Sequence, residues 1–338
     1  MNYFITGGTG FIGTHLTNLL KEKHPECNVY NLDIVSPGTP LPTVKDYEPA
    51  LRDGQKLAST FIRCDVRQPI FLDGISVTPN DIIFNFAAVH RTPGHFDHEY
   101  FETNIRGAEN VCAFAERHGI KKIVFTSSIA PYGAAEEEKF ETTLPTPNTA
   151  YGISKLVAEK IHMIWQAKNP VERQLIIVRP GVVFGKGENG NFTRLYWGIR
   201  GHKFMYPGRK DTIKACIYVK ELVRFMLYKL EHHGQGVELY NCTFEPAYTI
   251  EQIVETMKKV TGIKHSVPLI PAWILMSAAA VVGCLGAPMG ICPARVKKLM
   301  ISTNICGKKL SDSGYKFHYT FEEAIADWSK DNDNQYLK

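Results

Sequence analysis

Residues 2–13 read Asn2-Tyr3-Phe4-Ile5-Thr6-Gly7-Gly8-Thr9-Gly10-Phe11-Ile12-Gly13. The first five residues have the apolar and β-branched character of a buried strand, and residues 10–23 carry apolar side chains at helical spacing. Glycines at such a turn allow a tight bend and let backbone N–H groups approach a pyrophosphate at the start of the helix. A strand, a glycine-rich turn and a helix in this order therefore predict a dinucleotide-binding site.

Strand and helix patterns alternate outward from this stretch. Expected strands cover residues 2–6, 28–34, 60–63, 82–88, 122–127 and 174–179, and expected helices cover residues 10–23, 99–117, 150–165, 219–230 and 250–260. Such alternation implies right-handed crossovers and a parallel sheet covered on both faces. We therefore expect an α/β fold, a Rossmann-like doubly wound parallel sheet with a smaller C-terminal substrate-binding lobe.

The same pattern suggests how the chain divides. Residues 1–170 are expected to form the dinucleotide-binding domain, and residues 186–338 mainly the substrate-binding lobe. Parts of residues 171–185 and 212–242 are expected to return to the first domain. Residues 36–55 are rich in proline, glycine and aspartate, residues 185–208 are rich in glycine and aromatic residues, and both are expected to form loops.

Two acidic residues are expected at strand ends beside the glycine turn. Asp33 follows Gly13 by 20 residues, the spacing at which a carboxylate holds the ribose hydroxyls of the adenosine. The same carboxylate repels a 2′-phosphate, so we expect NAD as the cofactor rather than NADP. Asp65 and Val66 end the third strand, where Asp65 is placed to meet the adenine.

A tyrosine and a lysine four residues apart form the candidate catalytic pair. Tyr151 and Lys155 share one face at the start of an expected helix, and an ammonium beside a phenol lowers the pKa of that phenol. Such a tyrosine is able to remove a hydroxyl proton while a hydride leaves the same carbon. Ser127 and Ser128 end a strand 23 residues earlier, and Ser128 is the candidate to bond the reacting oxygen, with strand-end capping as the alternative.

At this point the chain resembles the extended short-chain dehydrogenase/reductases, in particular the nucleotide-sugar epimerase/dehydratase family. The resemblance runs in order from residue 1 to about residue 328. It rests on the glycine turn and on Phe86-Ala87-Ala88, Asn104 with Gly107, Phe125-Thr126-Ser127-Ser128 with Tyr132-Gly133, Tyr151-x-x-x-Lys155 and Arg179-Pro180-Gly181. It implies that Ser128, Tyr151 and Lys155 are catalytic. It also implies that Gly7, Gly10, Phe11, Ile12, Gly13, Ala87, Ala88, Tyr151 and Lys155 line the cofactor, and that Asn104 supports the active-site strand.

The residues that follow Ser128 narrow the reaction. Relatives that eliminate water or carbon dioxide carry a carboxylate near this hydroxyl, whereas this chain has Ile129 and Ala130. Epimerisation at C4 of a nucleotide-activated sugar, such as a UDP-sugar, needs only Tyr151, Ser128 and NAD. The alternatives are a nucleotide-sugar keto-reductase, an oxidoreductase on an apolar alcohol like the 3β-hydroxysteroid dehydrogenases, and an NAD-binding regulator without turnover. Net formation of NADH from a hydrophobic alcohol would select the oxidoreductase on an apolar alcohol.

Substrate contacts are indicated less clearly. The resemblance places a basic residue before the Ile217-Tyr218-Val219 segment against the diphosphate, and Lys214 occupies this place. Arg295 is a second candidate because of its basic neighbourhood, and His90 is either an additional acid or a loop histidine. Val182 stands where an asparagine is common in epimerases, which favours the apolar-alcohol alternative.

The composition of the chain indicates which classes of partner and which cellular compartment to expect. The formal charge of +5 is spread along the chain and does not form the basic cluster of a nucleic-acid-binding protein. The eight cysteines include no Cys-x-x-Cys pair, so we expect no metal site and reduced thiols in the cytoplasm, and the N-terminus lacks a signal-peptide pattern. Residues 267–293 carry no charge but are interrupted by prolines and glycines, so a buried or interfacial helix is expected rather than a spanning one, with peripheral membrane contact as the alternative. The resemblance implies a homodimer through residues 99–117 and 150–165.

Overall fold

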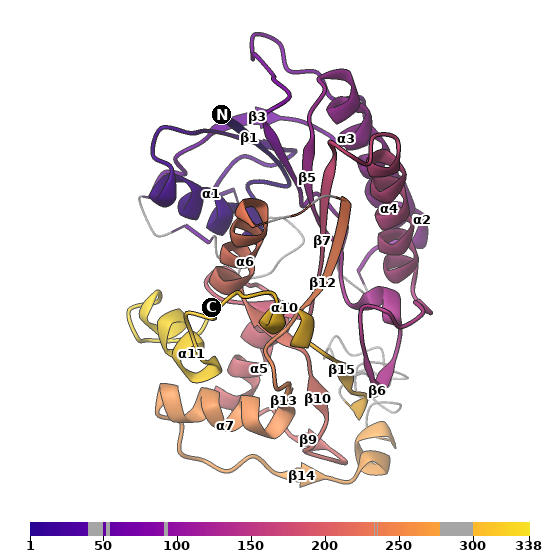
Figure 1. The fold of residues 1–338 in the computed structure, drawn as a ribbon. Helices are drawn as coiled ribbons and strands as arrows, with labels where there is room; N and C mark the ends of the chain where they lie inside the picture. The colour runs from indigo at the N-terminus through magenta and orange to yellow at the C-terminus, as the bar shows by residue number, and fades with distance from the viewer. Residues whose placement is uncertain (40–49, 52–54, 91–93, 233, 235, 278–299) are drawn as a thin grey trace.

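The computed structural model describes all residues except 40–49, 52–54, 91–93, 233, 235 and 278–299 (Figure 1). In the described part of the chain, seven parallel strands form a central sheet in the order β12-β7-β5-β4-β1-β2-β3. These strands are β1 (Asn2–Thr6), β2 (Asn28–Asp33), β3 (Thr60–Arg63), β4 (Ile82–Asn85), β5 (Lys122–Thr126), β7 (Gln174–Pro180) and β12 (Gly236–Cys242). The predicted doubly wound parallel sheet is confirmed.

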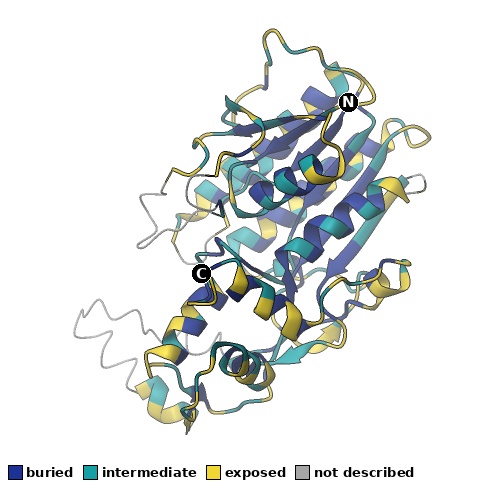
Figure 2. Cartoon of the chain, turned by 90° about the vertical axis from the view of Figure 1, so that its left-hand side faces the viewer, coloured by how far each residue is buried: buried dark blue, intermediate teal, exposed yellow. Residues whose placement is uncertain are grey.

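Helices cover both faces of this sheet. On one face lie α1 (Phe11–Lys23) and α6 (Val219–Glu231), and on the other lie α3 (Arg106–Arg117) and α4 (Ala150–Ala167) (Figure 1). Successive side chains of β1 point to opposite faces, so Ile5 joins the hydrophobic cluster under α1 while Phe4 joins the cluster under α3 and α4. The inner strands β1, β4, β5 and β7 are therefore buried on both sides, as Figure 2 shows, which explains their nearly continuous apolar sequences.

The strand order places a topological switch point beside β1. The chain runs from β1 outward to β2 and β3, and then returns to the other side of β1 as β4. In open α/β sheets, ligands bind at the carboxyl ends of the strands at such a point. The glycine turn after β1 and the residues after β4 therefore face each other at the edge where a cofactor is expected.

One predicted strand is too long. We expected an apolar strand over residues 82–88, but β4 ends at Asn85, a buried polar residue. Its amide oxygen accepts a hydrogen bond from the hydroxyl of Thr6 at 2.7 Å, and its amide nitrogen lies 3.1 Å from the ring of His162. Asn85 thus links β1, β4 and α4, and the chain leaves the sheet after it.

The remaining described elements build a second lobe. Its strands are β6 (Ala135–Lys139), β8 (Val182–Phe184), β9 (Tyr206–Pro207), β10 (Ile213–Lys214), β11 (Cys216–Tyr218), β13 (Tyr248–Thr249), β14 (Leu269–Ile270) and β15 (Thr303–Ile305). Its helices are α5 (Asn191–Arg200), α7 (Ile250–Thr261), α10 (Lys308–Asp312) and α11 (Phe321–Lys330). Its core is aromatic, with Phe184 stacked on Phe192 at a centroid distance of 4.8 Å and with Tyr218 and Trp328 nearby.

Helix α5 corrects the prediction that residues 185–208 form a loop. The buried carboxylate of Glu188 accepts hydrogen bonds from the backbone N–H groups of Phe192 and Thr193, which caps the start of the helix. Phe192, Tyr196 and Ile199 then follow at helical spacing and pack into the lobe core. The surrounding glycines hid this periodicity.

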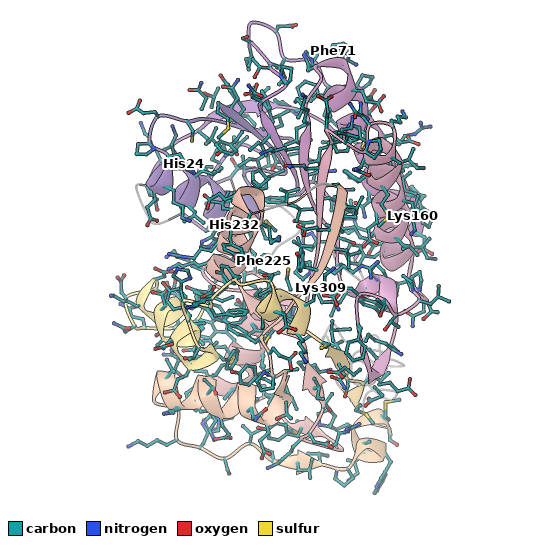
Figure 3. All side chains as sticks on the ribbon, viewed as in Figure 1. His24, Phe71, Lys160, Phe225, His232 and Lys309 are labelled. Atoms are coloured by element: carbon teal, nitrogen blue, oxygen red, sulfur yellow. The ribbon has the colours of Figure 1, made fainter. Side chains whose placement is uncertain are left out.

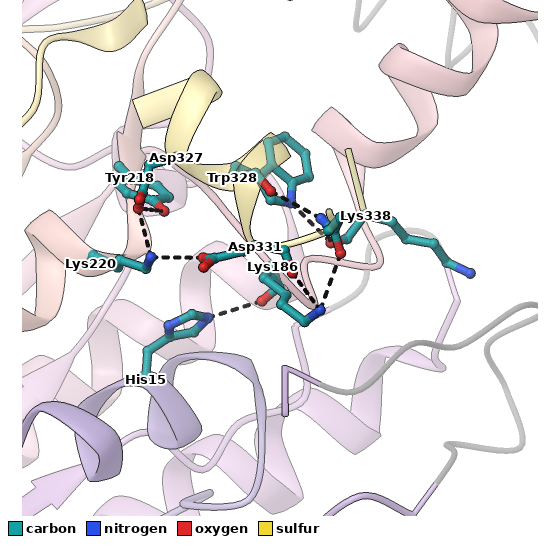
Figure 4. A network of polar contacts seen from close by, with 9 residues as sticks. His15, Lys186, Tyr218, Lys220, Asp327, Trp328, Asp331 and Lys338 are labelled. Carbon is teal, nitrogen blue, oxygen red and sulfur yellow. Dashed lines mark hydrogen bonds and ion pairs between the residues drawn. The ribbon is translucent and has the colours of Figure 1, made fainter. Parts of the chain in front are cut away.

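A polar network joins the two lobes (Figure 4). His15 of α1 lies 3.0 Å from the backbone oxygen of Lys186, and the Lys186 ammonium donates to the backbone oxygen of Asp331 at 2.9 Å. Lys220 of α6 pairs with Asp327 at 2.6 Å and Asp331 at 2.7 Å. The helix that follows the glycine turn is thus tied directly to the loop before α5 and, through Lys186, to the end of α11.

Among the described residues, no helix has both the length and the apolar character needed to cross a bilayer. The predicted peripheral segment, residues 267–293, lies mostly outside the described residues.

Candidate active site

The glycine turn after β1 leaves room for a ligand backbone. Gly7 has a φ of +67°, and a Cβ on it would lie 2.8 Å from the backbone nitrogen of Ala87, so no larger residue fits there. Gly10 is the N-cap of α1, and no side chain caps this helix or places an acid in its first turn. The first N–H groups of α1 therefore have no side-chain acceptor, and these residues fit the pyrophosphate of a dinucleotide.

Asp33 lies at the end of β2 beside this turn. Its carboxylate accepts hydrogen bonds from the backbone N–H groups of Thr9 at 3.2 Å and Ile34 at 2.8 Å. Both bonds orient the carboxylate at the same sheet edge as the turn, where an adenosine ribose would lie in the predicted arrangement. This geometry supports Asp33 as the ribose-binding acid.

Asp65 and Val66 make contacts within the protein, whereas Asp33 lies beside the glycine turn. The Arg67 guanidinium bonds both oxygens of Asp65, the shortest contact being 2.6 Å, and holds the pKa of that carboxyl below its usual range. Val66 is buried and contacts Gly107 of α3. The adenine contact of Asp65 stays a prediction. Its partner in the structure is Arg67, and the position of this arginine two residues later in the sequence could have indicated the pairing.

Ala87, Ala88, Phe11 and Ile12 surround the turn. The backbone nitrogen of Ala87 lies 3.5 Å from the Thr6 hydroxyl, and Ala87 and Ala88 are partly exposed. Phe11 meets the ring of His15 edge to face, and Ile12 packs against the hydrophobic clusters of both lobes. The two α1 residues therefore help to fix the helix in place as well as bordering the predicted cofactor site.

A close approach of α4 brings Tyr151 to Ser128. The Thr149 hydroxyl caps α4 by accepting the Gly152 N–H at 3.1 Å. A Cβ on Gly152 would lie only 2.7 Å from the Ala130 backbone oxygen, so glycine lets the first turn of α4 touch the loop after β5. In this position the Ser128 hydroxyl lies close enough to Tyr151 to lower the pKa of the phenol. Two predicted catalytic residues that lie 23 positions apart are thereby brought together.

Burial dominates the pKa of Tyr151 in this geometry, and activation of the phenol by Lys155 stays a prediction. Burial raises the pKa of Tyr151 to about 12, with a smaller increase from Tyr100, and the nearby Ser128 hydroxyl opposes both. The ring of Tyr100 lies 6.0 Å from that of Tyr151. The positive nicotinamide ring of oxidised NAD, when bound, would also favour the phenolate.

Lys155 is held beneath the end of β5. Its ammonium donates to the Thr126 backbone oxygen at 2.6 Å and lies 4.7 Å from the centre of the Phe125 ring. Burial lowers the pKa of Lys155 to about 7, while Glu159, one helical turn further on, opposes this shift. A pKa that falls near neutrality at a buried site is characteristic of functional groups.

Asn104 supports the site through hydrogen bonds to the backbone of Val89 and to Ser154. The predicted helix over residues 99–117 consists of α2 (Asp97–Tyr100), the π-helix η1 (Phe101–Ile105) and α3, and η1 contains Asn104. Its amide oxygen accepts from Val89 N–H, and its amide nitrogen donates to the Val89 oxygen and to the Ser154 hydroxyl at 2.9 Å. Asn104 thus joins the loop after β4 to α4. This geometry corresponds to the predicted support of the active-site strand, and a direct cofactor contact stays a prediction.

The substrate candidates are dispersed. The Lys214 ammonium donates to the Ile301 backbone oxygen at 2.6 Å, and both lie in the second lobe. His90 is exposed in the loop after β4, and Arg295 lies outside the described residues. The described residues contain no cluster of three or more His, Cys, Asp or Glu side chains able to hold a metal ion.

The geometry also reveals residues that sequence reasoning missed. Glu159 and Arg179 form a buried ion pair under the site, and Ser154 connects Asn104 to the carbonyl of Tyr151. The repeat of polar residues along the inner side of α4 was the available signal, because Lys155 and Glu159 follow Tyr151 at four-residue spacing.

Comparison with known proteins agrees with this arrangement. Residues 3–243 match the model of the NAD-dependent epimerase/dehydratase family. A protein of Escherichia coli O157:H7 named N-acetyl-α-D-glucosaminyl-diphospho-ditrans,octacis-undecaprenol 4-epimerase is 31% identical over 328 residues, which cover 96% of this chain and 93% of that protein. The UDP-glucose 4-epimerase of Halalkalibacterium halodurans is 26% identical over 79% of this chain and 82% of its own.

Solved structures share the fold. The UDP-glucuronic acid 4-epimerase from Bacillus cereus in complex with NAD superimposes with a TM-score of 0.72 and 19% identity, and the match covers 99% of this chain and 100% of that chain.

Proposed function

This chain belongs to the NAD-dependent epimerase/dehydratase family, and we propose that it inverts C4 of a diphosphate-activated sugar, with a nucleotide sugar such as a UDP-sugar as the first candidate. The observation that carries the proposal is the approach of Ser128 to Tyr151, close enough to lower the pKa of the phenol, with Lys155 one turn away, at the sheet edge next to the glycine turn. This is the hydroxyl chemistry that transient oxidation of a sugar alcohol needs.

The proposed roles follow from the positions of the side chains. NAD, when bound, supplies the hydride acceptor and a positive ring that favours the phenolate. Tyr151 removes the proton of the sugar 4-hydroxyl as the hydride departs, and returns it after the keto sugar has presented its other face. Ser128 bonds the reacting oxygen in both directions. Lys155, as an ammonium, stabilises the phenolate and lies close enough to the β5 end to hold a ribose hydroxyl.

The loop after β5 favours this reaction over elimination or decarboxylation. Ile129 and Ala130 follow Ser128, so no carboxylate stands next to the reacting hydroxyl to remove a ring proton. The backbone N–H of Ala130 instead donates to the Ser128 oxygen at 3.1 Å, which fixes the serine rotamer. A reaction that consumes no net hydride agrees with the choice of NAD by Asp33.

A second candidate substrate has a polyprenyl group in place of the nucleoside on the sugar diphosphate. The E. coli relative is named for a sugar on undecaprenyl diphosphate, and it aligns with 96% of this chain, against 79% for the H. halodurans UDP-glucose 4-epimerase. The second lobe also exposes large apolar residues: Trp273 is 72% exposed and Leu269 is 49% exposed. A polyprenyl carrier in place of a nucleoside accounts for both observations.

These residues define an apolar tip, Leu269, Trp273 and Ile274, that we propose as the contact with a membrane surface. The loops before β9 and β14 lie side by side at the other end of this strand pair, because the rings of His202 and His265 stack at 3.8 Å. These two loops carry the exposed lysines Lys203 and Lys264. An apolar tip on a lobe that also exposes lysines suits an anionic bilayer surface.

The outer face of α4 supports the proposed homodimer. Ile153, Val157 and Ile164 are exposed apolar residues on this helix, and Lys160 projects from its outer side (Figure 3). An amphipathic helix that exposes such a row gains by pairing with its copy. The free described cysteines agree with a cytoplasmic location. Sedimentation velocity of the Ile164→Glu variant, which should dissociate into monomers, tests the dimer.

The decisive experiment offers both carriers to the purified protein with NAD. Proton NMR would follow the C4 epimer from UDP-glucose, UDP-N-acetylglucosamine and a short-chain polyprenyl diphospho-N-acetylglucosamine in detergent. Epimer formed from any of these supports the proposal, and the preferred carrier decides between its two forms. If no epimer formed while a sterol alcohol generated NADH, the apolar-alcohol oxidoreductase would replace it.

A further inference from the structure

A buried charged pair lies directly below the catalytic residues. The Glu159 side chain is fully buried and the Arg179 side chain is 3% exposed. Arg179 donates from Nε to Oε1 of Glu159 at 2.8 Å and from a terminal nitrogen to Oε2 at 2.6 Å. Such bidentate geometry fixes both side chains. The reaction roles assigned above use neither residue.

The same carboxylate also holds the end of β5. Oε1 of Glu159 accepts a hydrogen bond from the Ser127 hydroxyl at 2.5 Å. Ser127 precedes Ser128, and the backbone of this segment is bonded to β7 through Ser127 N–H to the Val178 oxygen and Ile129 N–H to the Pro180 oxygen. Glu159 therefore connects α4, the end of β5 and the end of β7 at one point.

We propose that Glu159 is a positioning residue for the epimerisation proposed above, because it keeps the Ser127–Ser128 strand end and the Lys155 ammonium in register with Tyr151. Tyr151, Lys155 and Glu159 follow each other at intervals of one helical turn on α4, so movement of the carboxylate displaces the whole row. The role rests on the proposed function, but the geometry behind it is independent of the sugar.

The charges around Lys155 explain why the carboxylate matters chemically. Burial lowers the pKa of Lys155 to about 7, and Glu159 is the charged group that raises it. Arg179 faces the same carboxylate from β7, and burial lowers the pKa of His162, further along α4, to about 4, so that His162 is neutral at pH 7. The Tyr151 phenol is neutral too, because burial raises its pKa to about 12.

The test needs variants that separate this role from simple support of the fold. Glu159→Gln alone leaves the Arg179 guanidinium buried without its counter-ion, which destabilises the protein. The double variant Glu159→Gln/Arg179→Gln removes both charges and keeps amide groups that can bond each other and Ser127. Glu172→Gln is the matched control, because Glu172 forms an exposed pair with Lys121.

Two readouts are measured on the double variant and the control. Lysine side-chain NMR, with Lys155→Met for assignment, should show the Lys155 titration midpoint about one pH unit lower than in the wild type, and kcat at pH 8 should fall about tenfold with KM within twofold. The alkaline limb of the kcat profile should move to lower pH by the same amount, because the ammonium is lost earlier.

The outcomes are distinct. A double variant that folds, titrates Lys155 at the wild-type midpoint and keeps the wild-type kcat profile overturns the proposal. A wild-type protein that epimerises none of the offered sugars overturns the proposed function instead, and the NMR midpoint still decides whether Glu159 controls Lys155.

Discussion

The sheet edge and the second lobe of this molecule are built by different means. At the sheet edge, buried polar side chains have several partners each: Asn104 bonds the Val89 backbone and Ser154, and Glu159 bonds Ser127 and Arg179. The second lobe is held by aromatic contacts around Phe184, and its tip exposes Trp273.

This difference fits the proposed division of labour, with the chemistry at the sheet edge and recognition of the substrate carrier in the second lobe. A proton transfer requires groups held within a fraction of an ångström, which a hydrogen-bonded network provides because its bonds are directional. Recognition of a carrier tolerates looser contacts, since apolar surface is gained without fixed geometry. We therefore expect the removal of a single atom at the sheet edge to affect activity strongly. We expect substitutions in the second lobe to affect binding in proportion to the apolar surface or charge that they remove.

The largest expected effect tests the sheet edge. Tyr151→Phe removes one oxygen atom, and kcat for epimerisation should fall about a thousandfold because the general acid–base group is lost. NAD content after purification, read from absorbance of the released dinucleotide, should remain at the wild-type level. Wild-type turnover by this variant would end the proposed mechanism.

The junction between the two regions should respond to pH. Burial lowers the pKa of His15 to about 4, with a further decrease from Lys220, against an increase from the Lys186 carbonyl bond. The unfolded chain binds the proton with a pKa of about 6.5, so stability is full above that value and falls as the pH drops towards 4. From pH 8 to pH 5 the loss attributable to His15 is about 2 kcal/mol.

Urea unfolding at both pH values measures this contribution. His15→Gln should lose about 2 kcal/mol less on acidification than the wild type. His98→Gln, at an exposed position, serves as the control and should behave as the wild type does. Parallel pH slopes for His15→Gln and the wild type would show that the junction does not depend on a neutral His15.

A charge change in the lobe should affect binding and spare the chemistry. Lys214→Ala removes the cation predicted to meet the diphosphate, so KM should rise about tenfold with kcat nearly unchanged. The effect should be the same for both carriers, because both contain the diphosphate, and Lys214→Arg should retain affinity. Lys210→Ala is the control, since Lys210 pairs with Glu251. A fall in kcat alone would argue against a diphosphate contact.

The smallest expected effect concerns the apolar tip. Trp273→Ser should reduce co-sedimentation with vesicles containing anionic lipid about fivefold, as expected from loss of roughly 1 kcal/mol of apolar burial. Turnover of a soluble UDP-sugar should not change. Equal sedimentation of variant and wild type would remove the membrane proposal while leaving the sheet-edge chemistry intact.

Local patterns were sufficient for much of the fold and for the main candidates. The strand–glycine–helix order predicted β1, the turn and α1, because Gly7 and Gly10 act through backbone geometry within a few residues. Tyr151 and Lys155 were predictable because helical spacing alone puts them on one face. The end of β4 and helix α5 were missed because Asn85 bonds Thr6 and His162, and Glu188 caps α5, through contacts that no local hydrophobic period records.

By itself, then, the sequence determined the parallel sheet, the glycine turn and the placing of Tyr151 and Lys155 on one helix face, since each depends on short-range periodicity or on a backbone that only glycine adopts. Only the tertiary structure decided that Ser128 meets Tyr151, and that one carboxylate on α4 holds the ends of β5 and β7. These contacts join residues from separate elements, and packing of helices on the sheet selects them from many pairings that the sequence allows equally.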